Sequence, residues 1–271
     1  MRFRGAFHAH STFSYDGRDT LKRLTGELRR RGYQFLLLTE HDDKLTAEAF
    51  GRVVAAAAEL SGPEFLVVPG LEIRCWRHEH EQWHIAALGV REWIPRGPIP
   101  EVARAIHAAG GLAILLHPYK HAPVINPAEL GIFDGIEIWN GKFDGFYAPQ
   151  GRTLRLFHAL QELKSPPAFY CGHDLHGVDA IAPLALEVEA DRLEGNLLLA
   201  ALRSGRFELR AGGGRFTSRR GPSFGQEIYL RAVRAGYVVY KVARRLPFVG
   251  AVLGAARDTV RPADPFDSIP E

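Results

Sequence analysis

The chain has 271 residues, of which 46% are hydrophobic, so it is long enough and apolar enough for one large α/β core. The net charge of +3 is uneven, because residues 215–245 contain eight Lys or Arg against one acid, and the slightly acidic remainder gives no reason to expect a nucleic-acid partner. The two cysteines are far apart, which argues against a disulfide framework and a thiolate metal site. The N-terminus has no apolar signal core and no apolar run is long enough to span a bilayer, so we expect a cytoplasmic protein.

Short apolar runs alternate along the chain with segments of helical period. The predicted strands are residues 3–7, 35–39, 65–68, 84–89, 112–116, 135–140, 168–171 and 184–188. The predicted helices are residues 20–31, 50–60, 98–109 and 152–163, a short helix opening at Asn126-Pro127, and a helix after a capping box at Asp191 and Glu194. Asp19 is expected to cap the first helix, and the polar segment 74–82 is expected to be a flexible loop or lid. Seven βα-like repeats predict a barrel or a wound parallel sheet.

The composition changes after Arg210. Residues 212–214 are three glycines, typical of a hinge or linker, and residues 215–226 have no apolar period. Residues 228–245 predict a basic helix that either docks on the main domain or a partner subunit, or lies on an anionic membrane. We therefore expect a main domain over residues 1–211 and a basic, partly helical extension over residues 212–271.

Residue types that bind metal ions recur at the ends of the predicted strands. His8 and His10 are two residues apart, so in an extended segment both imidazoles point the same way. The full set at strand ends is His8, His10, His41, Glu72, His117, Asp174 and His176. Taken singly, each has an ordinary interpretation as a cap, a solvated acid or a turn residue. Together they predict a site at the C-terminal rim of a parallel α/β fold, where such folds assemble their chemistry.

In order, these motifs resemble those of the PHP (polymerase and histidinol phosphatase) family over roughly residues 2–210. The motifs are His8-x-His10, Ser14-x-Asp16-Gly17, Thr39-Glu-His41-Asp, Gly70-x-Glu72, His84, His117-Pro118 and Asp174-x-His176-Gly177. The resemblance implies a distorted (β/α)7 barrel that holds two or three metal ions at its rim. It also implies hydrolysis of phosphate esters as the commonest activity.

The resemblance also assigns the ligands. It implies one metal held by His8, His10, Glu72 and Asp174, a second by Glu72, His84 and His117, and a third by Asp16, His41 and His176. Glu72, Asp16, His41 and His176 are then also the expected catalytic residues. The sequence departs from the family pattern at Glu40, where Asp is frequent, and at His173, where a small residue is usual. Asp16 is variable in the family, and it could instead be a turn residue that bonds its own backbone.

Mixed imidazole and carboxylate donors suit zinc, manganese or iron. Metal ions a few ångströms apart can bridge a hydroxide and clamp the oxygens of an in-line displacement, so no nucleophilic side chain is needed. The expected function is hydrolysis of a small phosphorylated substrate by a metal-bridged hydroxide, and the alternative is a non-catalytic metal-binding scaffold or interaction module. Candidate substrate-binding residues are Arg18, Lys120, Arg152 and His173.

Overall fold

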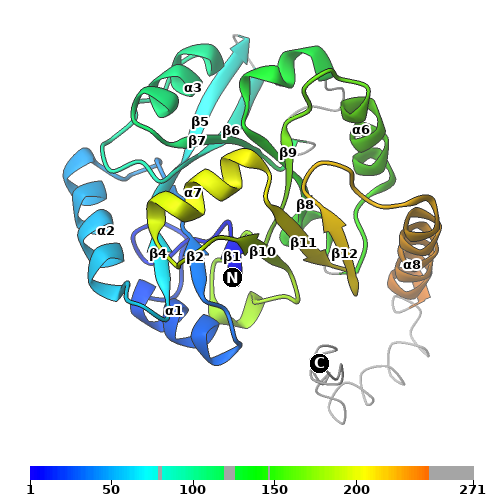
Figure 1. Cartoon of the computed structure of the whole chain (residues 1–271), viewed down its shortest axis with the longest axis horizontal. Coiled ribbons are helices and arrows are strands. Elements are labelled where there is room, and N and C mark those ends of the chain that lie inside the picture. Colours follow the sequence, from blue (N-terminus) through cyan, green and yellow to red (C-terminus); the bar gives the residue numbers. More distant parts are fainter. Residues whose placement is uncertain (79–80, 119–125, 146, 244–271) are drawn as a thin grey trace.

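The strands form two sheets at the centre of the molecule, with helices around them (Figure 1). A computed structural model of the chain describes residues 1–78, 81–118, 126–145 and 147–243. The first sheet contains β1 (Arg2–Phe7), β2 (Phe35–Leu37), β4 (Leu66–Val68), β10 (Ala185–Glu189), β11 (Phe207–Ala211) and β12 (Gly214–Thr217), in the order β12-β11-β10-β1-β2-β4. The second contains β3 (Glu40–His41), β5 (Gly70–His78), β6 (Glu81–Leu88), β7 (Leu112–Leu116), β8 (Gly135–Asn140) and β9 (Ala168–Gly172), in the order β3-β5-β6-β7-β8-β9.

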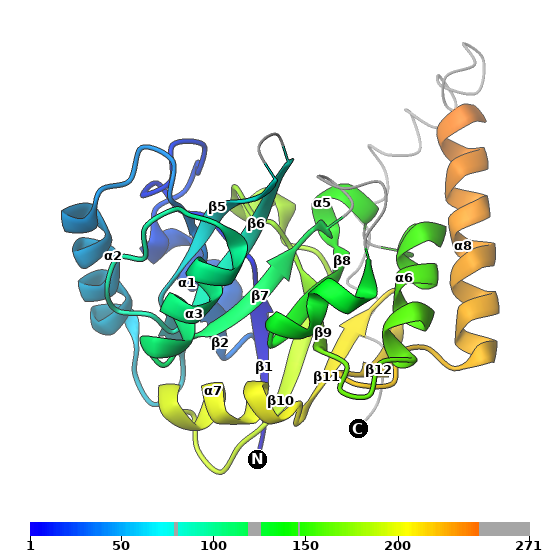
Figure 2. The ribbon, with the colours of Figure 1, turned by 90° about the horizontal axis from the view of Figure 1, so that it is seen from above.

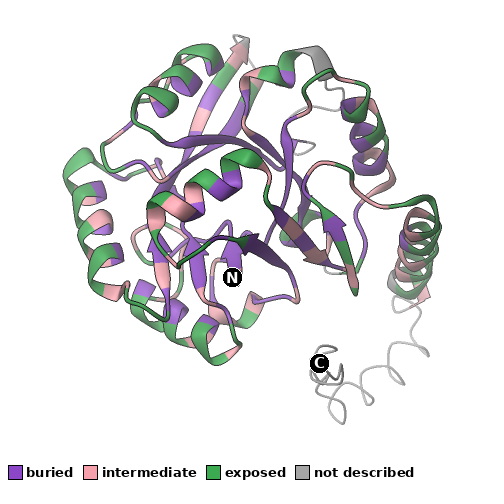
Figure 3. Cartoon of the chain, in the orientation of Figure 1, coloured by how far each residue is buried: buried purple, intermediate pink, exposed green. Residues whose placement is uncertain are grey.

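The helices lie mainly on the outside, with their exposed faces turned to solvent and the strands buried between them (Figure 3). They are α1 (Leu21–Arg30), α2 (Ala47–Leu60), α3 (Ile99–Ala108), α5 (Gly141–Asp144), α6 (Gly151–Gln161), α7 (Gly195–Ser204) and α8 (Phe224–Ala243), with 3-10 turns η1 (Pro127–Ile132) and η2 (Val178–Ala180). Figure 2 shows α8 at one side of the molecule, beside α6. Among the described residues, no helix is both long and apolar enough to cross a membrane.

The fold is mixed α/β. Five of the ten strand pairings among the described residues are antiparallel, including β1 with β10 and β5 with β6. Hydrogen bonds within the described residues hold two separate sheets and do not close them into one barrel, so the predicted (β/α)7 barrel is not confirmed. The apolar runs predicted which segments are buried strands, but an apolar run does not specify the direction of its neighbour.

The first helix follows its predicted pattern except at the cap. Leu21, Leu24 and Leu28 are buried on one face, and burying a leucine side chain contributes roughly 1.5–3 kcal/mol. The N-cap is Thr20, whose hydroxyl accepts a hydrogen bond from the Arg23 amide, so the prediction of Asp19 was wrong. The Asp19 carboxylate instead accepts from the amide of Val178 at 2.8 Å, and this bond ties the start of α1 to η2.

Most of the segment predicted to be a flexible loop, residues 74–82, lies instead in the paired strands of a hairpin. β5 and β6 pair in antiparallel register from Gly70 opposite Leu88 to Trp76 opposite Gln82. Its polar residues alternate with buried ones such as Ile73 and Cys75, which is the period of a strand with one covered face. Residues 79 and 80 lie outside the described residues.

The glycines predicted to form a hinge make a tight turn. Gly212 and Gly213 have φ angles of 56° and 77°, which favour glycine, and Ala211 pairs with Gly214 across the turn. The residues after this turn therefore add β12 to the first sheet before α8 begins. The predicted capping box is also absent at α7, where Glu194 is the N-cap without a side-chain cap bond.

Candidate metal centre

The predicted ligands meet where strands of both sheets end. His8 directly follows β1, His117 directly follows β7, and Asp174 lies two residues beyond β9. The amide of His10 donates to the carbonyl of Leu175 at 2.8 Å, and the amide of Leu175 donates to the carbonyl of His8 at 3.0 Å. These two bonds hold the segment after β1 against the segment after β9. They bring together ligands separated by more than half of the chain.

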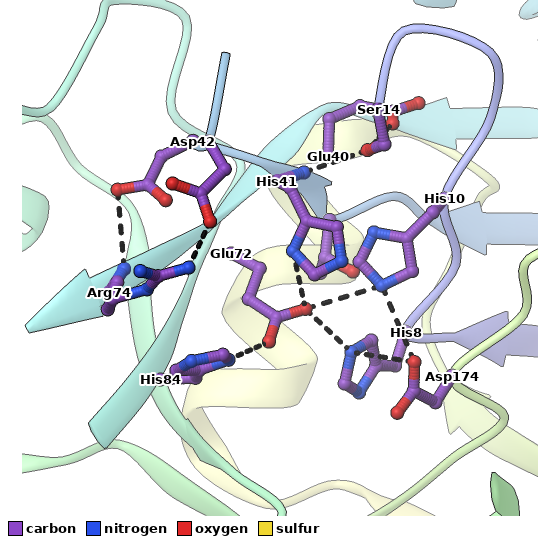
Figure 4. A network of polar contacts seen from close by, with 12 residues as sticks. His8, His10, Ser14, Glu40, His41, Asp42, Glu72, Arg74, His84 and Asp174 are labelled. Atoms are coloured by element: carbon purple, nitrogen blue, oxygen red, sulfur yellow. Dashed lines mark hydrogen bonds and ion pairs between the residues drawn. The ribbon is translucent and has the colours of Figure 1, made fainter. Parts of the chain in front are cut away.

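The carboxylate of Glu72 lies at the centre of the cluster (Figure 4). Its Oε2 is 3.0 Å from Nε2 of His8, 3.3 Å from Nε2 of His10 and 3.4 Å from Nδ1 of His41. Its Oε1 contacts Nδ1 of His84 and is 3.1 Å from Nε2 of His117. Each oxygen therefore faces its own set of imidazoles, which is the arrangement of a carboxylate that bridges two metal ions.

Four groups of side chains have ligand atoms close enough to share a metal ion. They are His8, His10 and Glu72; Glu72, His84 and His117; His8, His117 and Asp174; and His10, His41 and His176. The second group is the ligand set predicted for the second metal. Asp174 also lies close to the first predicted set, because its Oδ1 is 3.6 Å from Nε2 of His10.

Asp16 belongs to the same neighbourhood. Its Oδ2 is 3.0 Å from Nε2 of His176 and 3.5 Å from Nε2 of His41. The structure therefore brings together the three residues predicted for a third metal, with Asp16 partly exposed at the edge of the cluster. A partly exposed set with few protein ligands leaves coordination positions for water or substrate oxygens.

His10 provides a test of whether these residues fit a metal ion. The side chain is buried, yet neither ring nitrogen has a hydrogen-bond partner within the described residues. Buried polar atoms are normally hydrogen-bonded, and an unsatisfied one calls for a specific explanation. A cation shared with Glu72 would use the Nε2 lone pair, so this histidine fits a metal ligand better than a structural residue.

The charges of the cluster also suit a cation. Burial disfavours a charged His8, but the carboxylates of Glu137, Asp174 and Glu72 outweigh burial and raise its pKa well above the usual value. Burial likewise opposes charge on His10, while the nearby carboxylates of Asp174 and Glu72 raise its pKa to about 9. Burial also penalises the Glu72 carboxylate, but His8 and the other imidazoles hold its pKa well below the usual range. Ionised carboxylates are thus in place, and a metal ion would replace the imidazole protons.

Glu137 is a site residue that the sequence prediction missed. This buried carboxylate in β8 lies 2.8 Å from Nδ1 of His8 and accepts from the His117 amide and from Asn140 Nδ2, both at 2.9 Å. A Cβ at Gly172 would come within 1.8 Å of Glu137 Oε1, so only glycine leaves room for this carboxylate. The sequence did contain one signal, a lone acid in an apolar strand. A buried charge requires a partner, so this acid indicated a nearby polar group.

Glu40, noted as a departure from the family pattern, supports the loop that follows His10. Its buried carboxylate accepts hydrogen bonds from the amide of Ser11 and, at 2.5 Å, from the hydroxyl of Ser11. It also contacts the hydroxyl of Ser14. The Ser14 hydroxyl in turn accepts from the amide of His41 at 2.9 Å. Glu40 thus links the segment that carries Asp16 to the strand that carries His41.

A polar cavity of about 380 Å³ opens over the cluster. Its lining residues are Tyr15, Asp16, His41, Asp42, Asp43, Glu72, Arg74, Gln82, His84, His117, Lys142 and Asp174. Two basic side chains line this cavity. Lys142 Nζ is 3.6 Å from Asp174 Oδ1, and Arg74 pairs with Asp43. Arg96 Nε lies 2.5 Å from Asp42 Oδ2 and so holds in place a lining residue that also accepts from the amide of Arg74.

The residues predicted to bind substrate are mostly placed elsewhere. Arg18 donates to the carbonyl of His176 and to Asp179 and does not line this cavity. Arg152 lines a smaller cavity of about 80 Å³ beside His117. His173 is buried on the other side of the backbone, 3.1 Å from the carbonyl of Ala182.

The prediction of a substrate contact was therefore wrong for His173. Its ring contacts the carbonyls of Phe7 and Ala182 and the hydroxyl of Tyr33, and it is not among the residues that line the cavity. Burial lowers the pKa of His173 to about 4. Lys120 lies outside the described residues.

No family model and no curated protein matches the chain. Solved structures that share its fold at low identity include proteins from Bacteroides vulgatus, Bifidobacterium adolescentis and Pseudomonas syringae. A two-domain protein from Bacteroides vulgatus ATCC 8482, containing a predicted PHP-like metal-dependent phosphoesterase, has 17% identity and a TM-score of 0.58 over 77% of this chain and 64% of its own. A candidate metal-dependent phosphoesterase from Bifidobacterium adolescentis ATCC 15703 has 15% identity and a TM-score of 0.50, over 74% of this chain and 94% of its own.

PsfC from Pseudomonas syringae PB-5123 has 13% identity and a TM-score of 0.54, over 87% of this chain and 99% of its own. The chain thus spans 64% of the Bacteroides protein, which is less than two thirds of its length. At identities of 13–17% these similarities establish the fold that the proteins share. Function must be argued from the site itself.

Proposed function

We propose that the protein hydrolyses a small phosphate ester with two or three divalent transition-metal ions, which are zinc, manganese or iron. The observation that carries this proposal is the position of Glu72, with one carboxylate oxygen facing His8, His10 and His41 and the other facing His84 and His117. A buried carboxylate between two sets of imidazoles suits a bridged pair of metal ions. The open polar cavity above it would let a substrate from solvent reach that pair.

Bound metal ions would supply Lewis acidity and lower the pKa of a water molecule, as in other metal-dependent hydrolases. In this chain, Glu72 would join the two main sites, and Glu137 would keep the Nε2 lone pair of His8 directed at the cluster by holding its Nδ1 proton. Asp16, His41 and His176 would hold a third, more exposed ion. Glu40 would fix the loop that positions Asp16.

The cavity suggests how a phosphate group would be held. Arg74 and Lys142 lie on its wall, and both can neutralise phosphate oxygens while the rest of the substrate extends toward solvent. Lys142 has 47% of its side chain exposed and therefore reaches a ligand without losing much hydration. The mostly polar lining favours a hydrophilic leaving group over a lipid or a large aromatic one.

The predicted or candidate phosphoesterase activities named for the Bacteroides and Bifidobacterium proteins are consistent with this proposal. The described ligand set also supports catalysis over the alternative of a metal-binding scaffold, because the cluster opens into a cavity instead of being closed on all sides.

The test is a screen of metal-replete protein against sugar, nucleotide and amino-alcohol phosphates. We expect hydrolysis of at least one, loss of activity after chelation, and recovery with manganese or zinc. Elemental analysis should give two or three metal ions per chain, and Glu72→Gln should remove more than one of them. If metal-replete protein hydrolyses none of the phosphates, the scaffold function replaces this proposal.

The phosphate-binding role has its own matched pair of variants. Lys142→Met should raise the KM for phosphate esters without changing the metal content, because Lys142 lines the cavity but supplies no ligand atom. Lys164→Met is the control, since Lys164 is exposed and is not among the lining residues. Equal KM values for the two variants would exclude Lys142 as a phosphate contact.

A further inference from the structure

Within the part of the chain that the structure describes, helix α8 is anchored by one face. Leu230 is 2% exposed against the core, and Glu227 lies 2.7 Å from His158 of α6. Arg234 donates to the carbonyl of Asp144 at 2.5 Å, which also holds this face in place. The opposite face points away from the rest of the molecule, at its side (Figure 2).

The outward face is unusually apolar. Seven of the twelve exposed large hydrophobic side chains among the described residues lie on α8. Ile228 is 53% exposed, Val239 is 67% exposed and Val242 is 60% exposed. An exposed, contiguous apolar patch of this kind marks an interaction surface.

These side chains form one stripe with the spacing of a helix–helix seam. The outward stripe consists of Ile228, Ala232, Ala235, Val239 and Val242, all exposed. Their spacing of four, three, four and three residues is that of the a and d positions of a heptad repeat, which packs against a second helix. The docked face of α8, around Leu230, is on the other side, so the stripe is not explained by the packing of α8 on the described part of its own chain.

Charge favours a second copy of this chain as the occupant. The stripe itself is uncharged, and the neighbouring Arg231 is paired with Glu227 of the same helix at 2.5 Å. Two such faces therefore approach without repulsion between like charges. An anionic lipid surface would instead need cations directed at it. Of the basic side chains that the structure describes on α8, Arg231 is paired with Glu227 and Arg234 is bonded to backbone carbonyls.

The side-chain sizes are also self-complementary. When two copies of α8 pair antiparallel about a two-fold axis, Ala232 and Ala235 meet near the axis, and Ile228 of one copy faces Val239 of the other. Small residues at the centre allow the helices to approach closely, and larger ones fill the space on either side. Such a self-complementary patch is what an isologous dimer requires.

We propose that the outward stripe of α8 is a dimerisation surface for a second copy of this chain. The helix is already held by its inner face, so association does not have to pay for folding it. The stripe covers about four helical turns, which is short for a seam, and the dimer should therefore be weak and concentration-dependent.

The test uses the full-length chain in sedimentation velocity over a concentration series. The wild-type chain should shift from monomer to dimer, and Val239→Glu should lower the association constant by about tenfold or more, because each dimer would bury two added charges. Tyr240→Glu is the matched control, since Tyr240 is exposed on the same helix but lies outside the stripe. Thermal unfolding and metal content should be the same for both variants.

A second measurement locates the contact. Ala235→Cys should form a disulfide-linked dimer on mild oxidation and Tyr240→Cys should not, while the native Cys75 and Cys171 are buried and do not compete. A wild-type chain that stays monomeric throughout, a Val239→Glu variant that dimerises normally, or a failure of Ala235→Cys to cross-link would each overturn the proposal. Monomeric protein that binds phosphatidylserine vesicles through Val239 would overturn it in favour of a lipid surface.

Discussion

The orienting role of Glu137 can be tested by Glu137→Gln, which keeps the size of the side chain. The wild-type carboxylate accepts from two proposed ligand residues, from His8 at Nδ1 and from the His117 amide. A glutamine amide has one acceptor atom and one donor group, so it cannot accept at both places. If its NH₂ faces His8, the imidazole must carry its proton on Nε2, the atom that faces Glu72. If its NH₂ faces His117, the amide of that ligand loses its acceptor.

Either orientation weakens metal binding. Residues that orient metal-bound histidines change metal affinity or activity by roughly 10–100-fold when they are replaced, which corresponds to about 1.4–2.7 kcal/mol. We therefore expect Glu137→Gln to weaken zinc or manganese binding by this factor, measured by competition with a chromophoric chelator. Activity at subsaturating metal should fall in parallel, and excess metal should restore part of it.

Glu187→Gln is the control for replacing a buried carboxylate. Glu187 lies in β10 and pairs with Arg210 at 2.6 Å, and its described ion pairs are all with arginines. This variant should change stability without changing metal affinity. A Glu137→Gln protein that binds metal as tightly as the wild type would refute the orienting role, and so would equal losses of affinity in both variants.

Three further predictions concern the cluster and the thiols. Asp16→Asn should lower turnover and the occupancy of a third metal more than it lowers stability, and full metal content with full turnover would assign Asp16 to the turn alone. Chelation should lower the melting temperature, because a ligand at 100 times its Kd stabilises the native state by about 2.7 kcal/mol, and an unchanged temperature would contradict a native metal site. Burial raises the pKa of Cys75 and of Cys171, so both remain neutral thiols at pH 8. They should react with a thiol reagent only after unfolding, and fast reaction of the native protein would contradict their burial.

The sequence predicted the segments of the fold better than their arrangement. Apolar runs located strands such as β1, β7 and β9, because burial on both faces leaves a clear pattern. The β5–β6 hairpin was missed because polar residues mask its alternation. One of its charges, Arg77, pairs with Glu81 inside the hairpin at 2.8 Å and also with the distant Glu129 at 2.7 Å, and local sequence holds no sign of the second pairing.

The predicted ligands could be found because their residue types are rare at strand ends without a function. The supporting groups could not be found in this way. Glu137 looked like an isolated acid and Glu40 like a departure from the family pattern. Their roles appear only when the strands place them beside His8 and the Ser11–Ser14 loop. For His173 the residue type was misleading, because its ring contacts the backbone carbonyls of Phe7 and Ala182 and lies away from the cavity.

The backbone of the cluster explains why the ligands converge. The sequence argument placed His8 and His10 on one side of a regular strand, but His8 has a φ of 64°, and Asp174 and His117 have φ angles of 56° and 25°. Left-handed backbone costs a non-glycine residue roughly 1–2 kcal/mol. Three of the four such residues in the described chain are proposed ligands. Glycine would relieve the cost at each position but would remove the imidazole or carboxylate. The backbone therefore retains strain where it turns these side chains into the cluster, and hydrogen bonds such as that from the His117 amide to Glu137 hold the turn in place.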